Sequence, residues 1–447
     1  MYDGHGPNEK WCTLVHVCRR WRNLTFTSPR HLNLALLYRP FRRSVKEMLD
    51  VWPELPINIS LHRYPTQESI DNVIAALRLN HRVSGIDFGE NTSDSAWERF
   101  VPLMQQPLPG LTRLWIRLKP YVSNNIAISR SFLGGSAPSL RDLLLVDVPF
   151  PALPELLLSA TNLVCLRYNH IPRSVYISPQ AMITGLSALT RLESLSLIFR
   201  SPQSLPDRVV KIPPPHTRIL LPALTDLRFE GAPEYMEHLV AQIDAPLLES
   251  MDVTLLNREI LEVSELAKFV RRVDKPSLLD RARVTFNPER ISVMLLQEPG
   301  WNIDPKTVKL SPKCLESDLR FSYLARFCAS CFPTPSPFES LHICVPHYYR
   351  WKDIIDNPDP QWLELLCLFN SVKKLYLSRY AAPRITQVLR GLPAERVLKV
   401  LPALEKVHIA RLEPLGPLRE AISEFADARQ LSGHPVFIDD WWGGDYI

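Results

Sequence analysis

The chain of 447 residues is 46% hydrophobic and 22% charged, which excludes an intrinsically disordered protein and allows two or three ordinary domains or one extended repeat domain. Eight cysteines without an N-terminal signal peptide favour reduced thiols, so we expect a cytoplasmic or nuclear protein that is not secreted. No apolar run is long enough to cross a bilayer, and we expect no membrane partner.

The net charge of +5 comes wholly from residues 1–50, which hold nine Lys or Arg and four Asp or Glu. Apolar residues within 14–24 recur at spacings of three and four, which predicts an amphipathic helix that ends at the TSP of 27–29. The arginines of this helix are Arg19, Arg20 and Arg22. Because they cluster on one short helix and do not line a groove interleaved with aromatics, we expect no nucleic-acid partner. The apolar face of the helix consists of Leu14, Val17, Cys18, Trp21 and Leu24.

Two early strands are predicted at 55–61 and 82–88, with a helix at 69–79 between them. After them the pattern Leu-x-x-Leu-x-Leu, or a close variant, recurs at intervals of 23 to 34 residues within 111–253 and again within 338–409. The side chains of its last four residues are expected to alternate between the two faces of a short strand, and its leading residue is expected to turn into the core. The leading residues are Leu111, Leu140, Leu163, Leu192, Leu224, Leu248, Phe338, Val372 and Leu404.

Helical patterns lie at 234–243, 264–273, 360–369 and 418–431. Short strands alternating with helices at this spacing predict an α/β fold, an irregular leucine-rich-repeat-like solenoid with parallel strands and outer helices. A doubly wound parallel sheet is the alternative, although it favours longer Val- and Ile-rich strands.

Residues 255–337 break the repeat, with weak strand patterns at 283–286 and 307–310, and are expected to hold degenerate repeats or an inserted loop. We therefore divide the chain into a partial all-α segment at 1–50 and a solenoid at 51–447. Residues 418–447, with the DDWWGGDY of 439–446, are expected to form a C-terminal cap on the last repeat.

The CASC of 328–331 has the spacing of a zinc or redox motif. Its possible further ligands, Cys314, His342, Cys344 and His347, show no second paired spacing, so we favour buried cysteines on a helix. The HYYRW of 347–351 fits either a binding patch or a loop anchored on the repeats. Because no nucleotide-binding, zinc-protease or serine-hydrolase motif occurs, we expect no catalytic site, no metal and no cofactor, and a protein that is not an enzyme. An enzyme or zinc protein built around 314–351 is the alternative.

A basic Trp-containing helix joined to a leucine-rich array resembles the F-box proteins of mushroom-forming fungi. The matching segments are 14–37, the WPELPINI of 52–59 and much of 362–441, so the resemblance covers nearly the whole chain. In that family the box normally opens with a helix that carries an LPxEIL-like motif. Only MYDGHGPNEK precedes Trp11 here, so the resemblance reaches the second half of the box.

In that family the helix binds the Skp-type adaptor of a cullin-RING ubiquitin ligase, and the repeat array binds the protein substrate. The resemblance implies a substrate-recognition subunit of a Skp-cullin-F-box ligase, and a stand-alone leucine-rich-repeat interaction protein is the alternative. The residues expected to contact the adaptor are Leu14, Val17, Trp21 and Leu24.

Residues between the core positions of the strands share the other face of the sheet. We expect this face to bind the protein substrate because it mixes arginines with aromatics, although solvated positions without a partner would give the same pattern. The expected substrate-binding residues are Trp115, Arg117, Arg167, Arg228, His342, Tyr376 and His408, with Arg113, Asn169, Asp226 and Glu230 in the same stripe.

Overall fold

The computed structural model describes residues 17–26, 34–36, 49, 56–61, 65–119, 128–201, 218–256, 263–273, 280–287, 290–296, 307–313, 328–329, 338–345, 361–412 and 415–441. Within them the chain is α/β, and its strands are mostly parallel. The chain divides into two compact units. Unit 1 comprises Met1–Gln203 and Ile219–Leu224, and unit 2 comprises Ser204–Arg218 and Thr225–Ile447.

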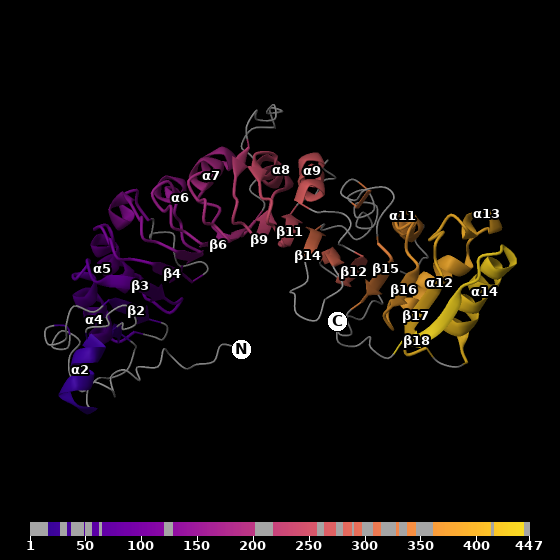
Figure 1. Cartoon of the computed structure of the whole chain (residues 1–447), viewed down its shortest axis with the longest axis horizontal. Coiled ribbons are helices and arrows are strands. Elements are labelled where there is room, and N and C mark those ends of the chain that lie inside the picture. The colour runs from indigo at the N-terminus through magenta and orange to yellow at the C-terminus, as the bar shows by residue number, and fades with distance from the viewer. Residues whose placement is uncertain are drawn as a thin grey trace. The chain divides into compact units, whose positions relative to one another are not determined.

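The main strands of unit 1 form a parallel sheet in chain order, and helices cover one of its faces (Figure 1). Hydroxyl groups of Thr66, Ser93 and Ser178 accept backbone N–H groups at the starts of α4, α5 and α7, which fixes where these helices begin. The strands are β1 (Leu34–Leu36), β2 (Ile57–Leu61), β3 (Val83–Phe88), β4 (Arg113–Arg117), β5 (Asp142–Val146), β6 (Cys165–Ile171), β7 (Ser194–Phe199) and the short β8 (Ile219–Leu220). The helices are α2 (Arg19–Phe26), α4 (Gln67–Leu77), α5 (Asp94–Met104), the 3₁₀ helix η3 (Phe132–Gly135), α6 (Leu153–Leu157) and α7 (Pro179–Leu186).

A tight turn precedes most of the repeat strands and explains the leading residue of the sequence pattern. The N–H of Leu111 donates to the carbonyl of Leu108, three residues earlier, and the same bond recurs at Leu140, Leu163 and Leu192. The turn directs the leading side chain into the core before the strand begins. All nine leading residues predicted from the sequence are at most 4% exposed, so this prediction is confirmed.

Unit 2 continues the alternation of strands and helices, and its sheet has the order β9-β11-β14-β13-β12-β15-β16-β17-β18. Its strands are β9 (Asp226–Gly231), β10 (Ile243–Asp244), β11 (Ser250–Leu256), β12 (Arg281–Asn287), β13 (Arg290–Leu296), β14 (Thr307–Lys313), β15 (Ser340–Cys344), β16 (Lys374–Leu377), β17 (Lys406–Ala410) and β18 (Phe437–Trp441). Its helices are α8 (Pro233–Ala241), α9 (Ser264–Val273), α11 (Gln361–Cys367), α12 (Ala382–Arg390), α13 (Ala394–Val397) and α14 (Pro417–Leu431).

Three strands of residues 255–337 belong to the main sheet of unit 2, so the two strands predicted in this segment are confirmed and a third was missed. The strands β12 and β14 contain the two weak patterns at 283–286 and 307–310, and β13 between them was not predicted. The strand β13 is antiparallel to both neighbours, so the sheet is not wholly parallel as expected. Buried Ile291, Val293 and Leu295 alternate with Ser292, Met294 and Leu296, and the apolar residues on both faces hide the alternation in the sequence.

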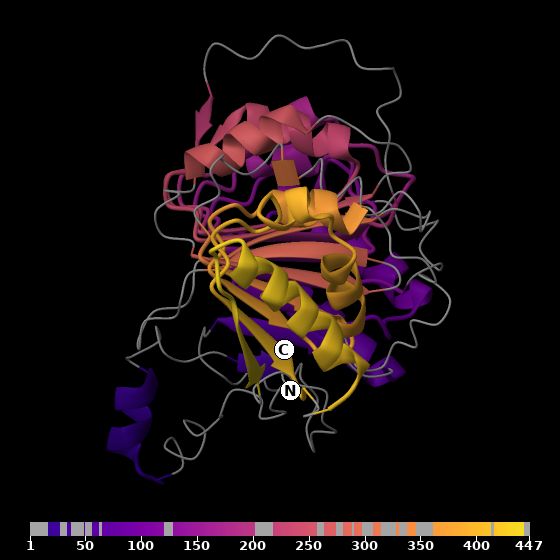
Figure 2. The same cartoon turned by 90° about the vertical axis from the view of Figure 1, so that its right-hand side faces the viewer.

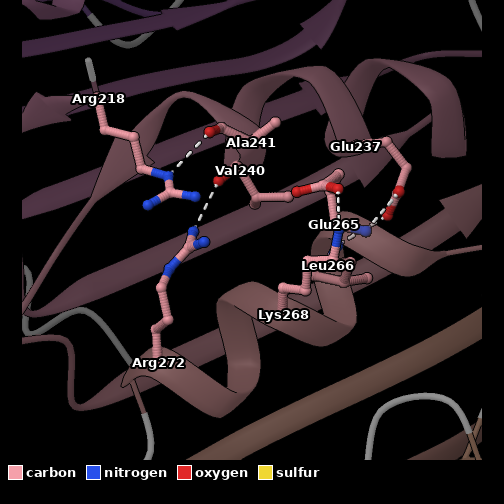
Figure 3. Close-up of polar contacts among 8 residues, drawn as sticks. All are labelled: Arg218, Glu237, Val240, Ala241, Glu265, Leu266, Lys268 and Arg272. Atoms are coloured by element: carbon pink, nitrogen blue, oxygen red, sulfur yellow. Dashed lines mark hydrogen bonds and ion pairs between the residues drawn. The ribbon is translucent and has the colours of Figure 1, made fainter. Parts of the chain in front are cut away.

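Charged side chains join α8 to α9 in unit 2 (Figure 3). The carboxylate of Glu237 on α8 accepts the backbone N–H groups of Glu265 and Leu266 in the first turn of α9, both at 2.8 Å. At the other end, Arg218 donates to the carbonyl of Ala241 and Arg272 to that of Val240, both at 3.1 Å. These contacts satisfy helix-end groups that have no partner within their own helix.

The predicted helix of the C-terminal cap is confirmed as α14, which packs beside β18 (Figure 2). The strand β18 pairs with β17 as the last strand of the sheet and contains Asp439 and Asp440 from the DDWWGGDY segment, whose remainder from residue 442 lies outside the described residues. Arg429 on α14 is fully buried and donates to backbone carbonyls within 397–404. This cluster ties α14 to the turn before β17.

Candidate functional site

The predicted substrate stripe occupies the sheet face opposite the core in each unit. In β4 the residues Leu114 and Ile116 are buried in the core, whereas Arg113, Trp115 and Arg117 face the other way. The same alternation holds in β9, where Arg228 is exposed and Asp226 and Glu230 are half-buried, and in β6, where Arg167 and Asn169 are half-buried. The outward position of these stripe residues is therefore confirmed.

Trp115 lies in the middle of the unit 1 stripe with three guanidinium groups around its indole. The Cζ atoms of Arg113, Arg117 and Arg167 lie 5.4, 5.6 and 5.6 Å from the ring centroid. The first two flank Trp115 on β4, and Arg167 comes from β6. At such distances each cation is attracted to the ring by about 0.5–1 kcal/mol when the site is exposed. We call these four residues the Arg–Trp cluster.

Two of the arginines in the Arg–Trp cluster are also held by carboxylates of neighbouring strands. Arg117 Nη1 lies 2.9 Å from Asp87 Oδ1, and Arg167 Nη2 lies 3.0 Å from Asp142 Oδ1. All four side chains are partly exposed, so each pair contributes at most about 1 kcal/mol to stability. Their main effect is to fix the two guanidinium groups beside the indole.

Arg113 and the Trp115 indole N–H retain free hydrogen-bonding capacity. Among the described residues, Arg113 forms no ion pair and Trp115 Nε1 is buried without a hydrogen-bond partner. The neighbouring strand has Gly85 beside them, where an added Cβ would lie 2.2 Å from Asn58 Oδ1 and 3.4 Å from Arg113 Nη2. The absence of a side chain at Gly85 thus leaves room for Asn58 and the Arg113 guanidinium.

A buried carboxylate at the end of β5 was missed in the sequence. The Asp147 side chain is 5% exposed and pairs with Arg200, which follows β7, and with His170 Nδ1 on β6 at 3.4 Å. Asp147 and His170 both have positive φ angles, 60° and 54°. The group joins the ends of three strands. An Asp directly after the apolar run of β5 was its only sequence signal, and such residues are common in turns.

Three aromatic rings from adjacent strands stack in unit 2. The ring centroids of His342 and Tyr376 are 4.2 Å apart and those of Tyr376 and His408 are 4.4 Å apart, with interplanar angles of 7° and 9°. The parallel register places the three residues directly opposite one another on β15, β16 and β17. We call them the ring ladder.

The ring ladder corrects one expectation, because His342 is only 5% exposed. It faces outward by register, but the neighbouring Tyr376 ring covers one of its faces. Burial, with Arg281 and Arg283 nearby, lowers the pKa of His342 to about 3. Burial also lowers the pKa of His408, against the opposing effect of Asp439 at 3.4 Å. Both imidazoles are therefore neutral at pH 7, and His342 contributes shape and packing to the surface.

The residues considered for metal binding do not form a site within the described part of the chain, which contains no group of three or more His, Cys, Asp or Glu suited to a metal ion. Cys328 and Cys344 on β15 are buried and form no disulfide, and the burial of Cys328 agrees with the expected packing role. Burial raises the pKa of the Cys344 thiol, which disfavours the thiolate that binds metals. The residues Cys314, Cys331 and His347, and the whole HYYRW segment, lie outside the described residues.

The predicted adaptor face lies on and just before α2, which spans Arg19 to Phe26. The side chains of Val17, Trp21 and Leu24 are 64%, 47% and 58% exposed. Trp21 and Leu24, three residues apart on α2, share one side of that helix, whereas Val17 lies before α2 and is separated from it by the non-helical Cys18. Leu14 lies outside the described residues.

The chain matches no model of a known protein family and no curated protein. Among the described residues, no helix has the length and apolar character needed to span a membrane.

Proposed function

We propose that this chain is the substrate-recognition subunit of a Skp-cullin-F-box type ubiquitin ligase. Residues around α2 bind a Skp-type adaptor, and the outward sheet faces bind a protein target. The architecture in this proposal is a leucine-rich-repeat-like solenoid. The recurring turn and strand unit and the parallel register support that architecture, and the resemblance of residues 14–37 to an F-box supports the adaptor role.

The main support for the proposal is the exposed apolar side chains of Trp21 and Leu24 on α2 and of Val17 just before it. Large apolar side chains grouped at an exposed surface usually mark an interaction site. Binding in a groove of a partner would bury them, and each large side chain contributes about 1.5–3 kcal/mol when it is fully buried. The three arginines beside these side chains, Arg19, Arg20 and Arg22, would lie at the rim and speed association.

The target-binding part of the proposal is supported by the Arg–Trp cluster. Trp and Arg are enriched among the residues that dominate the energy of protein interfaces. The cluster presents the Trp115 ring together with Arg113, which no described carboxylate pairs, on a rigid sheet. Rigid presentation limits the entropy lost on binding.

Capture of the chain by an immobilised Skp-type adaptor tests the adaptor role. Trp21→Ala and Val17→Asp are expected to weaken binding by about tenfold or more, because each removes apolar burial. Arg20→Ala on the same helix is the matched control and should change binding by no more than about threefold. If the wild-type chain does not bind the adaptor while its sheet faces still capture a partner protein, it is a stand-alone interaction protein.

A further inference from the structure

The strands β12 to β17 of unit 2 have an unusual charge distribution. Together they contain seven Lys or Arg residues and no Asp or Glu. The neighbouring strand β18, at the end of the sheet, contains the acidic residues Asp439 and Asp440. The middle of this sheet is therefore electropositive over several adjacent strands.

Four cations surround the ring ladder on the outward face. Arg283 continues the row of His342, Tyr376 and His408 by register. The next row places Arg281, Lys374 and Lys406 on the same face, with Ser340 between the first two. Lys374 and Lys406 are exposed, and the two arginines are half-buried.

Among the described residues, no ion pair engages Arg283, Lys374 or Lys406. Acidic residues border these strands: Asp280 and Glu405 directly precede β12 and β17, and Asp439 lies 3.4 Å from the neutral His408. Glu339, which precedes β15, binds Lys373 at 2.9 Å. Arg283 is the strongest indication of a missing anion, because its Nε is buried without a hydrogen bond from the described residues. A half-buried charge without a counter-charge is costly, and binding an anion removes that cost.

The ring ladder determines which anions fit. Both faces of Tyr376 are covered, one by His342 and one by His408, so a nucleobase cannot stack on it. Proteins that bind single-stranded nucleic acid rely on open aromatic faces. The outward edges of the rings instead lie beside the row of cations, and this arrangement suits an extended polypeptide.

We propose that the outward face of β12, β15, β16 and β17 binds an acidic segment of a partner protein, with its Asp or Glu carboxylates at Arg283, Lys374 and Lys406. The inference rests on the target-binding part of the proposed function and names the chemistry of the target. It does not depend on adaptor binding.

The spacing of the cations fits an extended segment laid across the strands. Adjacent strands are about 4.8 Å apart, so the three steps from β12, which contains Arg283, to β17, which contains Lys406, cover about 14 Å. Alternate residues of an extended chain lie about 6.7 Å apart on the same side, and residues four apart lie about 13 Å apart. Acidic residues four apart therefore span the distance from β12 to β17, with an alternate acidic residue between them.

Binding of labelled peptides to the purified full chain, measured by fluorescence anisotropy, tests the inference. The probe is a peptide of about ten residues with Glu at alternate positions, compared with the same peptide carrying Gln and with an oligothymidylate of about twelve nucleotides. The Glu peptide should bind at least about tenfold more tightly than the Gln peptide. Raising the salt from about 50 to about 200 mM should weaken it.

Reversal of the two exposed cations in Lys374→Glu with Lys406→Glu should weaken binding of the Glu peptide by about tenfold or more. The matched control, Lys399→Glu with Arg419→Glu, changes the net charge equally at exposed residues outside the strands and should leave binding within about threefold. Equal loss in both variants, tighter binding of the oligothymidylate, or no binding of the Glu peptide would overturn the inference. Adaptor capture by the same variants should stay unchanged, so failure of the adaptor role is seen separately.

Discussion

Replacing Arg429 by Met should detach the cap helix α14 from the rest of unit 2. The guanidinium is fully buried and donates to four carbonyls. The distances are 3.3 Å to Val397, 3.3 Å to Leu401, 3.2 Å to Pro402 and 3.1 Å to Leu404. No carboxylate pairs with Arg429 among the described residues, so the charge is compensated there by carbonyl dipoles alone.

The cost follows from counting the carbonyls that lose their donor. The Leu401 carbonyl keeps the N–H of Leu404, so three carbonyls are left. Each unsatisfied buried group costs about 1–3 kcal/mol, and removal of the buried charge offsets part of the sum. We therefore expect Arg429→Met to lower the free energy of unfolding of unit 2 by about 3–5 kcal/mol. Arg429→Lys should lose less, because an ammonium supplies up to three donors but lacks the planar fork.

Urea unfolding of the full chain and hydrogen exchange of residues 394–441 measure this effect. The matched control is Arg419→Met on the same helix, at an exposed position, which should change stability by no more than about 0.5 kcal/mol. Exchange should rise in α14 and β17 before it rises in β9 and β11. An Arg429→Met chain that is as stable as the control, with unchanged exchange in α14, would refute the role given to the carbonyl cluster.

Three further outcomes are expected. Trp115→Ala should reduce capture of partner proteins by affinity purification, whereas Trp115→Phe should retain part of it, because a phenyl ring still attracts the surrounding guanidinium groups; equal capture by all three chains would contradict the assignment. Because the pKa of His342 is about 3 in the folded chain and about 6.5 when unfolded, the unfolded state binds the extra proton between these values. The free energy of unfolding should fall by up to about 1.4 kcal/mol per pH unit as the pH drops below about 6.5. In thermal unfolding, His342→Phe should make stability depend less on pH in this range. Glu237→Ala should destabilise α9 by about 1–2 kcal/mol, seen as faster exchange at the N–H groups of Glu265 and Leu266, and unchanged exchange there would contradict the capping role.

The repeat strands were predictable because their leucines act at short range. Each leading residue and the strand after it lie within six residues, and the turn between them needs no distant partner. The strand β13 was missed for the opposite reason. Its outward Met294 and Leu296 are as apolar as its inward residues, so alternation gives no signal. Pairing with β12 and β14, not local pattern, determines that this segment is a strand.

The outward stripe was predictable in direction but not in detail. Alternation placed Trp115, Tyr376 and His408 on the correct face. It could not show that His342 is buried by its neighbours, since that depends on residues of other strands. The same limit explains why Asp147 and Arg429 were missed. Their partners come from other strands or turns and meet them only in the folded chain.

The antiparallel strand β13 leaves the outward face of unit 2 continuous although the repeat is interrupted. Side chains alternate between the two faces of a strand in either direction, so reversing a strand preserves its outward set when the register is kept. The register here aligns Lys309, Met294 and Arg283, and then Arg283 with the ring ladder. A shift of one residue in β13 would turn Ile291, Val293 and Leu295 to the outward face and Ser292, Met294 and Leu296 to the core face. The apolar core of β13 therefore fixes the position of the cations on both sides of it, which is why a segment without the leucine pattern still contributes to the candidate binding surface.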